Sequence, residues 1–268
     1  MKKRPPVAVT IAASDSGGGA GIQADLLTFA AHGVHGAAVL TAATAQNTVS
    51  VTAIEPLPPR FLRKQMDAGF GDLRPDAVKI GMLFDGPRIR AVAAGLRRWK
   101  AKNVVLDPVM VSKSGARLLS AAAVSILKAE LLPLCDLVTP NRPEAEALSG
   151  LRLSTESDRR LAAGEIADLG ARAVLVKGGH GRGRQVRDLL FDGRWFTVFA
   201  APRIATRATH GTGCTLSSAI AANLARGFSL EESVLAAIAY LRAGLARGIF
   251  PGHGFGVPDH FPPGRRMR

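Results

Sequence analysis

The chain has few of the residues that form covalent cross-links or metal sites. Only two of its 268 residues are cysteines, Cys135 and Cys214, and neither belongs to a CxxC pair. A disulfide framework and a structural zinc site are therefore excluded, and two isolated thiols favour a reducing compartment, the cytoplasm. The six histidines show no metal-ligand spacing either.

Aromatic residues and long apolar runs are also scarce. Aromatics make up 5% of the chain, so Ala, Leu and Val must form the core. No apolar run reaches the length of a membrane span, which predicts no membrane partner. The run 7–13 leads into a glycine-rich loop, which favours a buried strand over a signal peptide. The chain has no GxxxxGK[ST] P-loop and no GxSxG, and a GxGxxG pattern read from Gly17 fails at Ile22.

Acidic residues are few beside basic ones. The chain has 21 Asp and Glu against 35 Lys and Arg, a net charge of +14. One explanation is a nucleic-acid partner, and a basic nucleic-acid-binding protein without catalysis is the alternative from a different class. We favour a compositional bias combined with attraction for anionic small molecules, and we expect no nucleic-acid partner. The basic residues are scattered and do not alternate with aromatics as a stacking platform would.

Short apolar runs alternate with helical patterns along the whole chain, and apolar residues make up 47% of it. A helix is predicted near 120–131, and Asp192-Gly193 is a strong hairpin signal near the end of the sheet. The alternation predicts an α/β fold with three αβα layers, a mainly parallel sheet and a small β-rich edge, in a single domain over 1–268. The other strands are predicted at 7–13, 36–42, 50–57, 77–82, 103–110, 136–141 and 173–179.

Polar and glycine-rich stretches follow the predicted strands. In sheets of this kind, ligands bind beyond the carboxyl ends of the strands, where such stretches gather. Together they predict one binding site at that rim. The stretches are SDSGGGAG, QNT, GM, DPVMVSKSG, PNRPE and KGGHG.

The stretch HGTGCTLSSAIAANLARG places a thiol at a glycine-rich helix start. The amides of Thr212, Gly213 and Cys214, after Gly211, could hold a developing phosphoryl anion, because a helix N-terminus offers unpaired N–H groups. The same position lowers thiol pKa values, so a Cys214 thiolate could accept a proton from a substrate hydroxyl. The alternatives are an ordinary glycine loop and a small buried cysteine.

Further charged and polar residues follow other strands. Glu144 could orient Mg²⁺ through water, and Asn141 with Glu144 could equally cap a helix. Lys177 could neutralise phosphate charge or extend past the strand end into solvent. Asp107 could help to hold metal or phosphate, or start a turn with Pro108.

Two polar residues are candidates for recognising a ring. Asp25 and Gln46 would suit a heteroaromatic ring that carries an amino group and ring nitrogens, because an amide both donates and accepts. A polar pair buried for structural reasons is the alternative. His210, beside the glycine turn, is the one histidine of interest.

Taken together, the motifs resemble the hydroxymethylpyrimidine/phosphomethylpyrimidine kinases of thiamine biosynthesis, within the ribokinase-like superfamily. The resemblance covers residues 7–261, with the motifs in the family's order. The motifs are SDSGGGAGIQADL, AQNT, KIGML, LDPVM, KSG, TPNRPEAEAL, KGGH, HGTGCTLSSAIAA and GHGFGVPDHF.

The resemblance implies transfer of a phosphoryl group from MgATP to 4-amino-5-hydroxymethyl-2-methylpyrimidine and then to its monophosphate. It implies that Asp25 and Gln46 lie near the aminopyrimidine, with Met82 and Val109 against the ring. Ala13 stands where the family usually has glycine. The resemblance also implies a homodimer. A pyridoxal kinase is the nearest rival, and a variant that performs only the second phosphorylation is another.

For the phosphates, the resemblance implies an anion hole around Thr212 and its neighbouring amides. Cys214 stands where most ribokinase-like enzymes carry an aspartate base. The residues implied to serve the metal and phosphates are Asp107, Asn141, Glu144 and Lys177.

Overall fold

A single sheet runs through the computed structural model, which describes residues 4–111, 115, 118–179, 181 and 183–261. Within these residues nine strands form the sheet, in the order β3-β2-β1-β4-β5-β6-β7-β8-β9. Strands β2, β1, β4, β5, β6 and β7 are parallel, and antiparallel strands complete both edges. The mainly parallel sheet is therefore confirmed. The strands are β1 Val7–Asp15, β2 His35–Gln46, β3 Val51–Pro56, β4 Ala77–Ile80, β5 Val104–Leu106, β6 Leu137–Val138, β7 Val174–Val176, β8 Gln185–Phe191 and β9 Phe196–Pro202.

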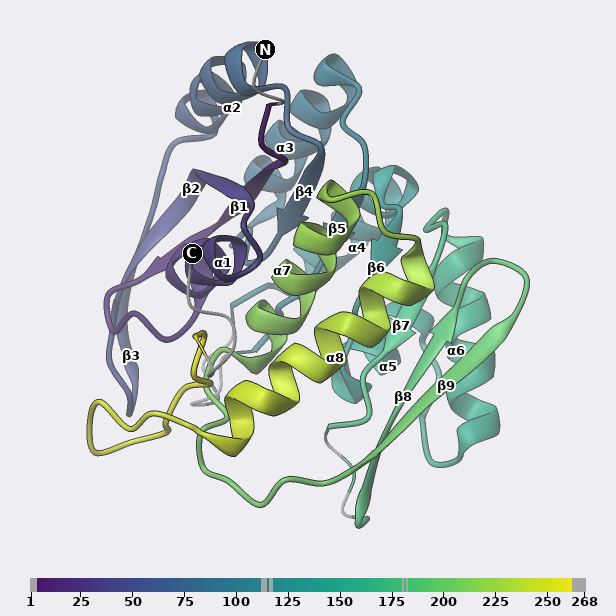
Figure 1. Ribbon diagram of the computed structural model, residues 1–268. Coiled ribbons are helices and arrows are strands. Elements are labelled where there is room, and N and C mark those ends of the chain that lie inside the picture. The colour runs from purple at the N-terminus through teal and green to yellow at the C-terminus, as the bar shows by residue number, and fades with distance from the viewer. Residues whose placement is uncertain (1–3, 112–114, 116–117, 180, 182, 262–268) are drawn as a thin grey trace.

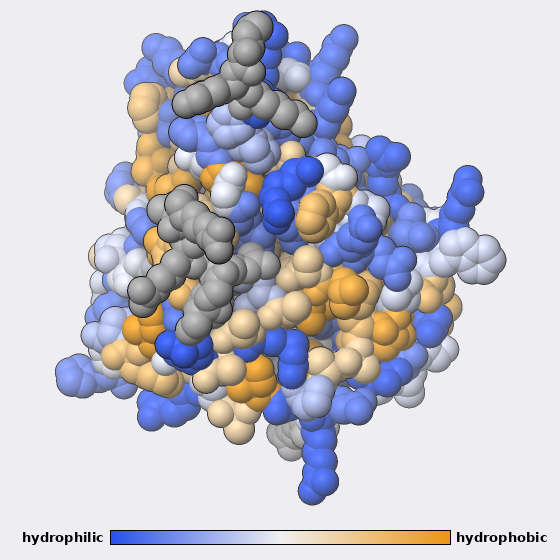
Figure 2. All heavy atoms as spheres, viewed as in Figure 1, coloured by the Kyte–Doolittle hydropathy of each residue, from blue (hydrophilic) through white to orange (hydrophobic). Residues whose placement is uncertain are grey.

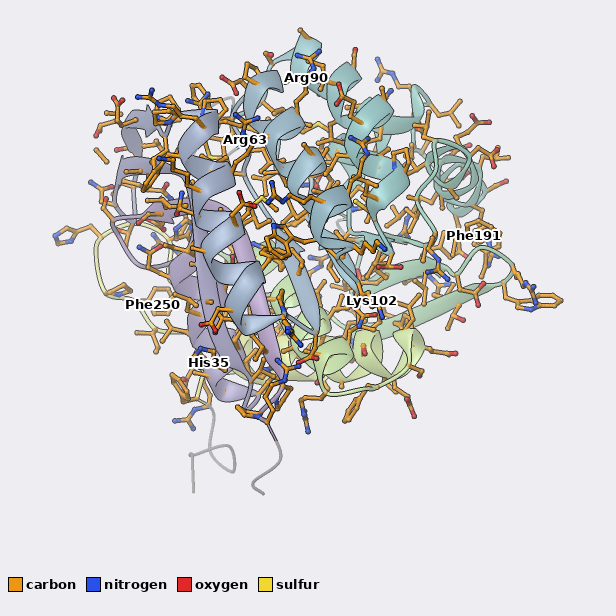
Figure 3. All side chains as sticks on the ribbon, turned by 90° about the horizontal axis from the view of Figure 1, so that it is seen from above. His35, Arg63, Arg90, Lys102, Phe191 and Phe250 are labelled. Atoms are coloured by element: carbon orange, nitrogen blue, oxygen red, sulfur yellow. The ribbon has the colours of Figure 1, made fainter. Side chains whose placement is uncertain are left out.

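Helices cover both faces of the sheet, which confirms the three predicted layers (Figure 1). Seen from above, α2 and α3 lie on one side of the strands, and α7 and α8 lie on the other (Figure 3). The helices are α1 Gly21–Ala31, α2 Pro59–Leu73, α3 Gly86–Trp99, α4 Ala121–Ile126, α5 Arg142–Ser149, α6 Glu156–Asp168, α7 Thr212–Ala225 and α8 Leu230–Ala246.

Alternation along the strands divides the core into two parts. In β4, Val78 and Ile80 face the cluster that α2, α3 and α6 cover, whereas Ala77 faces the cluster under α1, α7 and α8. Successive side chains of a strand point to opposite faces. Lys79 therefore points toward α1 and α7, although it is fully buried.

The strand order reverses between β1 and β4. From β1 the chain continues to β2 on one side, and β4 to β7 follow in order on the other. At such a switch point the loops beyond the strand ends diverge and leave a crevice for ligands. The glycine-rich loop after β1 lies at this position.

Several strands are shorter than predicted. Strand β5 stops at Leu106 and β6 stops at Val138, in place of 103–110 and 136–141. Pro108 and Pro140 lie two residues after these ends, and a proline cannot donate to a sheet ladder. The apolar pattern continued past these ends because the next residues line a cleft. The helix predicted near 120–131 is α4 followed by a π-helical turn at Leu127–Leu131.

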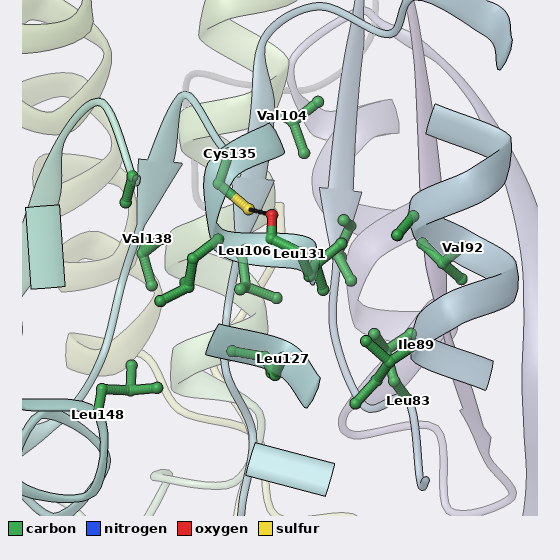
Figure 4. Close-up of a cluster of buried hydrophobic side chains, with 14 of the residues drawn as sticks. Leu83, Ile89, Val92, Val104, Leu106, Leu127, Leu131, Cys135, Val138 and Leu148 are labelled. Atoms are coloured by element: carbon green, nitrogen blue, oxygen red, sulfur yellow. Dashed lines mark hydrogen bonds between the residues drawn. The ribbon is translucent and has the colours of Figure 1, made fainter. Parts of the chain in front are cut away.

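Cys135 lies in the interior, as Figure 4 shows. Its thiol is 1% exposed and donates to the carbonyl oxygen of Leu131 at 3.2 Å, among aliphatic side chains such as Leu106 and Val138. Burial raises the pKa of this thiol well above its usual range. Both cysteines are free. Cys135 is therefore an unreactive core residue, which leaves Cys214 as the thiol of interest.

On the face viewed in Figure 2, apolar side chains gather across the middle of the lower half, and hydrophilic side chains dominate the outline. No helix in the described part of the chain is long and apolar enough to cross a membrane. Among the motif residues, Lys113, Ser114 and His180 lie outside the described residues.

Candidate active site

A cleft of about 1080 Å³ lies beyond the carboxyl ends of the parallel strands. All but one of the predicted site residues line it, and they come from loops that lie far apart in the sequence. The structure therefore brings these predicted residues together around one cleft. The residues that line the cleft are Ala13, Gln46, Met82, Asp107, Val109, Asn141, Glu144, Lys177, Gly211, Thr212, Gly213 and Cys214.

Helix α7 begins at the middle of the cleft, on Gly211. This N-cap residue has φ +73°, in the left-handed region that favours glycine. A Cβ there would overlap the carbonyl oxygen of Gly19, so the residue must be glycine for a second reason. The first N–H groups of α7, from Thr212 to Cys214, have no carbonyl partner within the helix. They are placed to bind an anion in the cleft.

Cys214 is half-buried in the first turn of α7 and lines the cleft. The lowered thiol pKa expected from its position at a helix N-terminus is wrong. Burial raises the pKa of Cys214 to about 11; the charge of Lys79 opposes this, and those of Asp25 and Asp107 add to it. The backbone N–H of Gly21 also favours the thiolate. In the absence of ligands Cys214 is therefore a protonated thiol at neutral pH.

Beside the start of α7 lies a cluster of two carboxylates and one ammonium. Lys177 Nζ donates to Asp107 Oδ1 at 2.6 Å and lies 3.9 Å from Glu144 Oε2. A Cβ on Gly213 would lie 3.1 Å from Asp107 and 3.3 Å from Lys177, so any larger residue there would push against this pair. Lys177 does not extend into solvent, because it is held by both carboxylates.

Glu144 also caps helix α5. Its side chain accepts from the N–H of Asn141 at 2.7 Å, and the Asn141 side chain accepts from the N–H of Glu144 at 3.0 Å. Burial raises the pKa of Glu144 to about 7, against the opposing charge of Lys177. The capping alternative is confirmed, and it leaves Glu144 at the cleft wall beside Lys177.

One part of the cleft wall is an apolar pocket. Ala13 and Met82 are 5% and 8% exposed and pack in one cluster with Leu118, while Val109 contacts the same group. An apolar pocket of this kind suits one face of an aromatic ring.

The polar wall of this pocket is Gln46. Its amide nitrogen lies 3.3 Å from His210 Nε2, and His210 Nε2 lies 2.8 Å from Asp15 Oδ2. Burial favours the neutral form of Asp15, but hydrogen bonds from His210 and from the N–H groups of Gly17 and Ala20 lower its pKa below the usual value. The interest in His210 is justified. Asp15 was missed because a carboxylate in a glycine loop has no distinctive spacing.

Asp25 is the predicted residue that does not line the cleft. It is fully buried, and its carboxylate accepts from Lys79 at 2.8 and 2.9 Å, from Thr10 at 2.6 Å and from Ser218 at 2.6 Å. The structural alternative for Asp25 therefore describes it, and direct contact with a ring is not what this position offers. Lys79, its partner, does line the cleft. The motif KIGML contains Lys79, but a strand lysine between apolar residues gave no signal.

A second group of lining residues is formed by the apolar Ala201, Ile204 and Leu241 and the charged Asp188 and Arg203. These residues come from β8, β9, the segment after β9 and α8. The sequence did not indicate them, because they follow no motif.

A family model decides which family this site represents. The model described as phosphomethylpyrimidine kinase matches residues 15–259, which is most of the chain. The chain belongs to the phosphomethylpyrimidine kinase family.

Relatives of this kinase family match over nearly the whole chain. The hydroxymethylpyrimidine/phosphomethylpyrimidine kinase of Rhizobium meliloti is 52% identical over 258 residues, 95% of this chain and 97% of its own. The thiamine biosynthesis bifunctional protein ThiED of Geobacter sulfurreducens is 52% identical over 94% of this chain, which spans only 51% of that protein. The chain therefore matches nearly the whole length of the Rhizobium meliloti protein and about half of the Geobacter sulfurreducens protein.

Among solved structures, the ADP complex of Bacillus subtilis pyridoxal kinase has a TM-score of 0.89 and 36% identity. It covers 96% of this chain and 98% of that one. The phosphomethylpyrimidine kinase fold is thus shared with pyridoxal kinases, and the ribokinase-like prediction is confirmed. Because the shared fold does not separate the two substrates, the choice between them rests on sequence identity and on the pocket.

Proposed function

We propose that the protein transfers the terminal phosphoryl group of ATP to the hydroxymethyl group of 4-amino-5-hydroxymethyl-2-methylpyrimidine, and then a second to the monophosphate. One observation carries this proposal. A single cleft is lined by the apolar side chains of Met82 and Val109, by those of Ile204 and Leu241, and by the first residues of α7, Thr212 to Cys214. This arrangement fits an alcohol and a nucleotide on either side of a phosphate site.

In this proposal the pyrimidine occupies the apolar pocket formed by Ala13, Met82 and Val109. Its ring lies against Met82 and Val109, and the amide of Gln46 faces its amino group and a ring nitrogen. An amide both donates and accepts, as an aminopyrimidine edge requires. The adenine lies in the part of the cleft that Ile204 and Leu241 line, against these two side chains. In this proposal the chain forms a single domain, and both the pyrimidine region and the adenine region of the cleft belong to it.

The phosphates lie at the start of α7 and beside Lys177. We propose Mg²⁺ as their counter-ion, with Glu144 facing it through water and Asp107 nearby. Carboxylate oxygens and water are the ligands that this ion prefers. No group of three or more His, Cys, Asp or Glu within the described residues could hold a metal, so such an ion would keep most of its water. When bound, it would neutralise phosphate charge.

The proton of the hydroxymethyl group goes to Cys214 in this proposal. Phosphoryl transfer has a loose transition state, so a base is needed only late, as the oxygen bonds to phosphorus. A thiolate whose thiol has a pKa of about 11 is a strong base for that late step. The anion hole at Thr212 and Gly213 supplies positioning and charge stabilisation.

A pyridoxal kinase is the second candidate, because the fold is so similar to that of the Bacillus subtilis enzyme. An ADP-release assay with hydroxymethylpyrimidine, its monophosphate and pyridoxal separates the two. We expect release with both pyrimidines at a kcat/KM far above that for pyridoxal. The reverse order would favour pyridoxal, and release with the monophosphate alone would indicate the variant specific for the second step. No release with any substrate would overturn the proposal.

We further propose a cytoplasmic homodimer. Two free thiols suit a reducing compartment. Exposed apolar side chains gather where 249–256 packs on the β2–β3 turn, near the residue labelled Phe250 in Figure 3. Val49 and Phe250 are 58% and 54% exposed, and the N–H of Phe255 donates to the carbonyl oxygen of Thr48, which joins the two segments. A second copy that covers this patch would bury it.

A further inference from the structure

A buried ion pair lies at the floor of the cleft, directly under the start of α7. Lys79 and Asp25 have no exposed side-chain surface, and Lys79 Nζ donates to both oxygens of the Asp25 carboxylate at 2.8 and 2.9 Å. Replacing a buried pair of this kind by apolar residues is often neutral or stabilising. Stability alone therefore does not explain why the two charges are there.

The contacts of Asp25 connect this pair to Cys214. The Ser218 hydroxyl donates to Asp25 Oδ1 at 2.6 Å, and Lys79 donates to the same oxygen. Ser218 follows Cys214 by four residues in α7, so the two lie on one face of the helix, one turn apart. Thr10 in β1 donates to the other oxygen at 2.6 Å. Asp25 is thus fixed from three elements and holds the ammonium one helical turn below the thiol.

Lys79 also reaches the cleft, whereas Asp25 does not. An ammonium has three donors, and the two carboxylate oxygens leave at least one for the cleft. Space around the amine is kept by Gly81, where a Cβ would lie 2.9 Å from Lys79 Nζ. Lys79 and Cys214 therefore line the same cleft, and the ammonium charge acts on the thiol.

We propose that Lys79 is a positioning residue for phosphoryl transfer, whose ammonium, held in place by Asp25, stabilises the Cys214 thiolate. The inference rests on the proposed function. In the step it serves, the substrate O–H bond breaks and its proton goes to the Cys214 sulfur. The substrate oxygen bonds to the γ-phosphorus, and the bond to the β-phosphate oxygen breaks to release ADP. The thiol then returns its proton to solvent.

The charges around Cys214 agree with this role. Lys79 faces it from β4, and the carboxylates are Asp25 on α1 and Asp107 after β5. Lys177 forms an ion pair with Asp107. Burial alone would lower the pKa of Lys79, but the carboxylate of Asp25 outweighs it, so the residue stays an ammonium. Lys79 is the cation that opposes the effect of burial on the thiol.

The test uses the two cysteines of the natural chain. Iodoacetamide reacts with thiolates, so the pH midpoint of alkylation reports the thiol pKa, while the plateau rate reports access. Intact mass and peptide mapping separate Cys214 from the buried Cys135, which serves as an internal control for unfolding. In Lys79→Met we expect the Cys214 midpoint to rise, so that alkylation at pH 8 slows about tenfold, while Cys135 stays unmodified. An unchanged midpoint in a variant that protects Cys135 would overturn the inference.

A second variant keeps the test decisive if Lys79→Met does not fold. The double variant Lys79→Met/Asp25→Asn removes both charges, and the amide can still accept from Ser218 and Thr10. We expect its Cys214 alkylation at pH 8 to be slower than in the wild-type protein but faster than in Lys79→Met. Alkylation at the wild-type rate or above in this variant would overturn the inference.

Kinetics then separate the inference from the proposed function. We expect kcat for hydroxymethylpyrimidine to fall about tenfold in Lys79→Met, with the KM for MgATP unchanged. A KM change with constant kcat would instead place Lys79 in nucleotide binding and contradict its role. If the protein phosphorylates no pyrimidine, the alkylation result still stands, because it needs no substrate.

Discussion

Replacing Gly211 by alanine perturbs the start of α7 without adding a functional group. With φ +73°, an alanine at this N-cap costs about 1–2 kcal/mol in backbone conformation alone. Its Cβ would also overlap the carbonyl oxygen of Gly19. The Gly19 loop cannot easily yield, because the Asp15 carboxylate accepts from the N–H groups of Gly17, Gly19 and Ala20 at 2.8, 3.1 and 2.9 Å. The N-terminus of α7 must therefore shift. A displacement of about 1 Å in a site that works by positioning lowers the rate about 100-fold.

The assay measures ADP release and thermal unfolding in two variants. Gly227 follows the same helix at its other end, with φ +89° and no atom within 4 Å of an added Cβ, so Gly227→Ala has the backbone cost without the overlap. We expect Tm to fall in both variants, by about 2–4 °C for each kcal/mol, and kcat to fall about 100-fold in Gly211→Ala alone. A folded Gly211→Ala variant that keeps the wild-type kcat would refute the reasoning.

Three further perturbations follow from the structure. Burial lowers the pKa of His260 to about 4, from 6.5, so between these values the unfolded chain binds a proton that the folded protein does not. Stability should therefore fall by about 3 kcal/mol as pH drops from 7 to 4, and His260→Asn should lack this part of the loss in urea unfolding; equal losses in both proteins would contradict it. Ala13→Gly removes a methyl group from the ring pocket, worth about 0.8 kcal/mol, and should raise KM for hydroxymethylpyrimidine about fourfold; an unchanged KM would mean that the ring lies elsewhere. Phe250→Asp should convert the dimer to a monomer in light scattering, and a dimer in both proteins would exclude the 249–256 patch as its interface.

The sequence predicted the layers and the parallel sheet, and every predicted site residue except Asp25 lines the cleft. Strand ends and glycine loops are local signals, and the rule that ligands gather beyond parallel strands turned them into one site. Gly211 and Gly213 illustrate this. Their spacing indicated close approach, and the structure gives the atoms they approach, Gly19 and the Asp107–Lys177 pair.

What the sequence missed depends on contacts between distant elements. Asp25 belongs to the glycine-rich motif SDSGGGAGIQADL, but only the packing of α1 against β4 and α7 shows that Lys79 and Ser218 donate to its carboxylate. The pKa of Cys214 likewise depends on burial and on Asp107, which outweigh the helix terminus considered from the sequence. Such charge balances are set by tertiary structure and leave no periodic pattern in the chain.

The central claim places Cys214 between the alcohol and the terminal phosphate, and turnover of Cys214→Ala tests it most directly. We expect kcat for hydroxymethylpyrimidine and for its monophosphate to fall by about 10² to 10⁴, as for loss of a general base, while ATP still binds. Cys214→Asp should retain more activity than the alanine variant, because a carboxylate can also accept the proton. A Cys214→Ala protein that phosphorylates both pyrimidines at the wild-type rate would contradict the account.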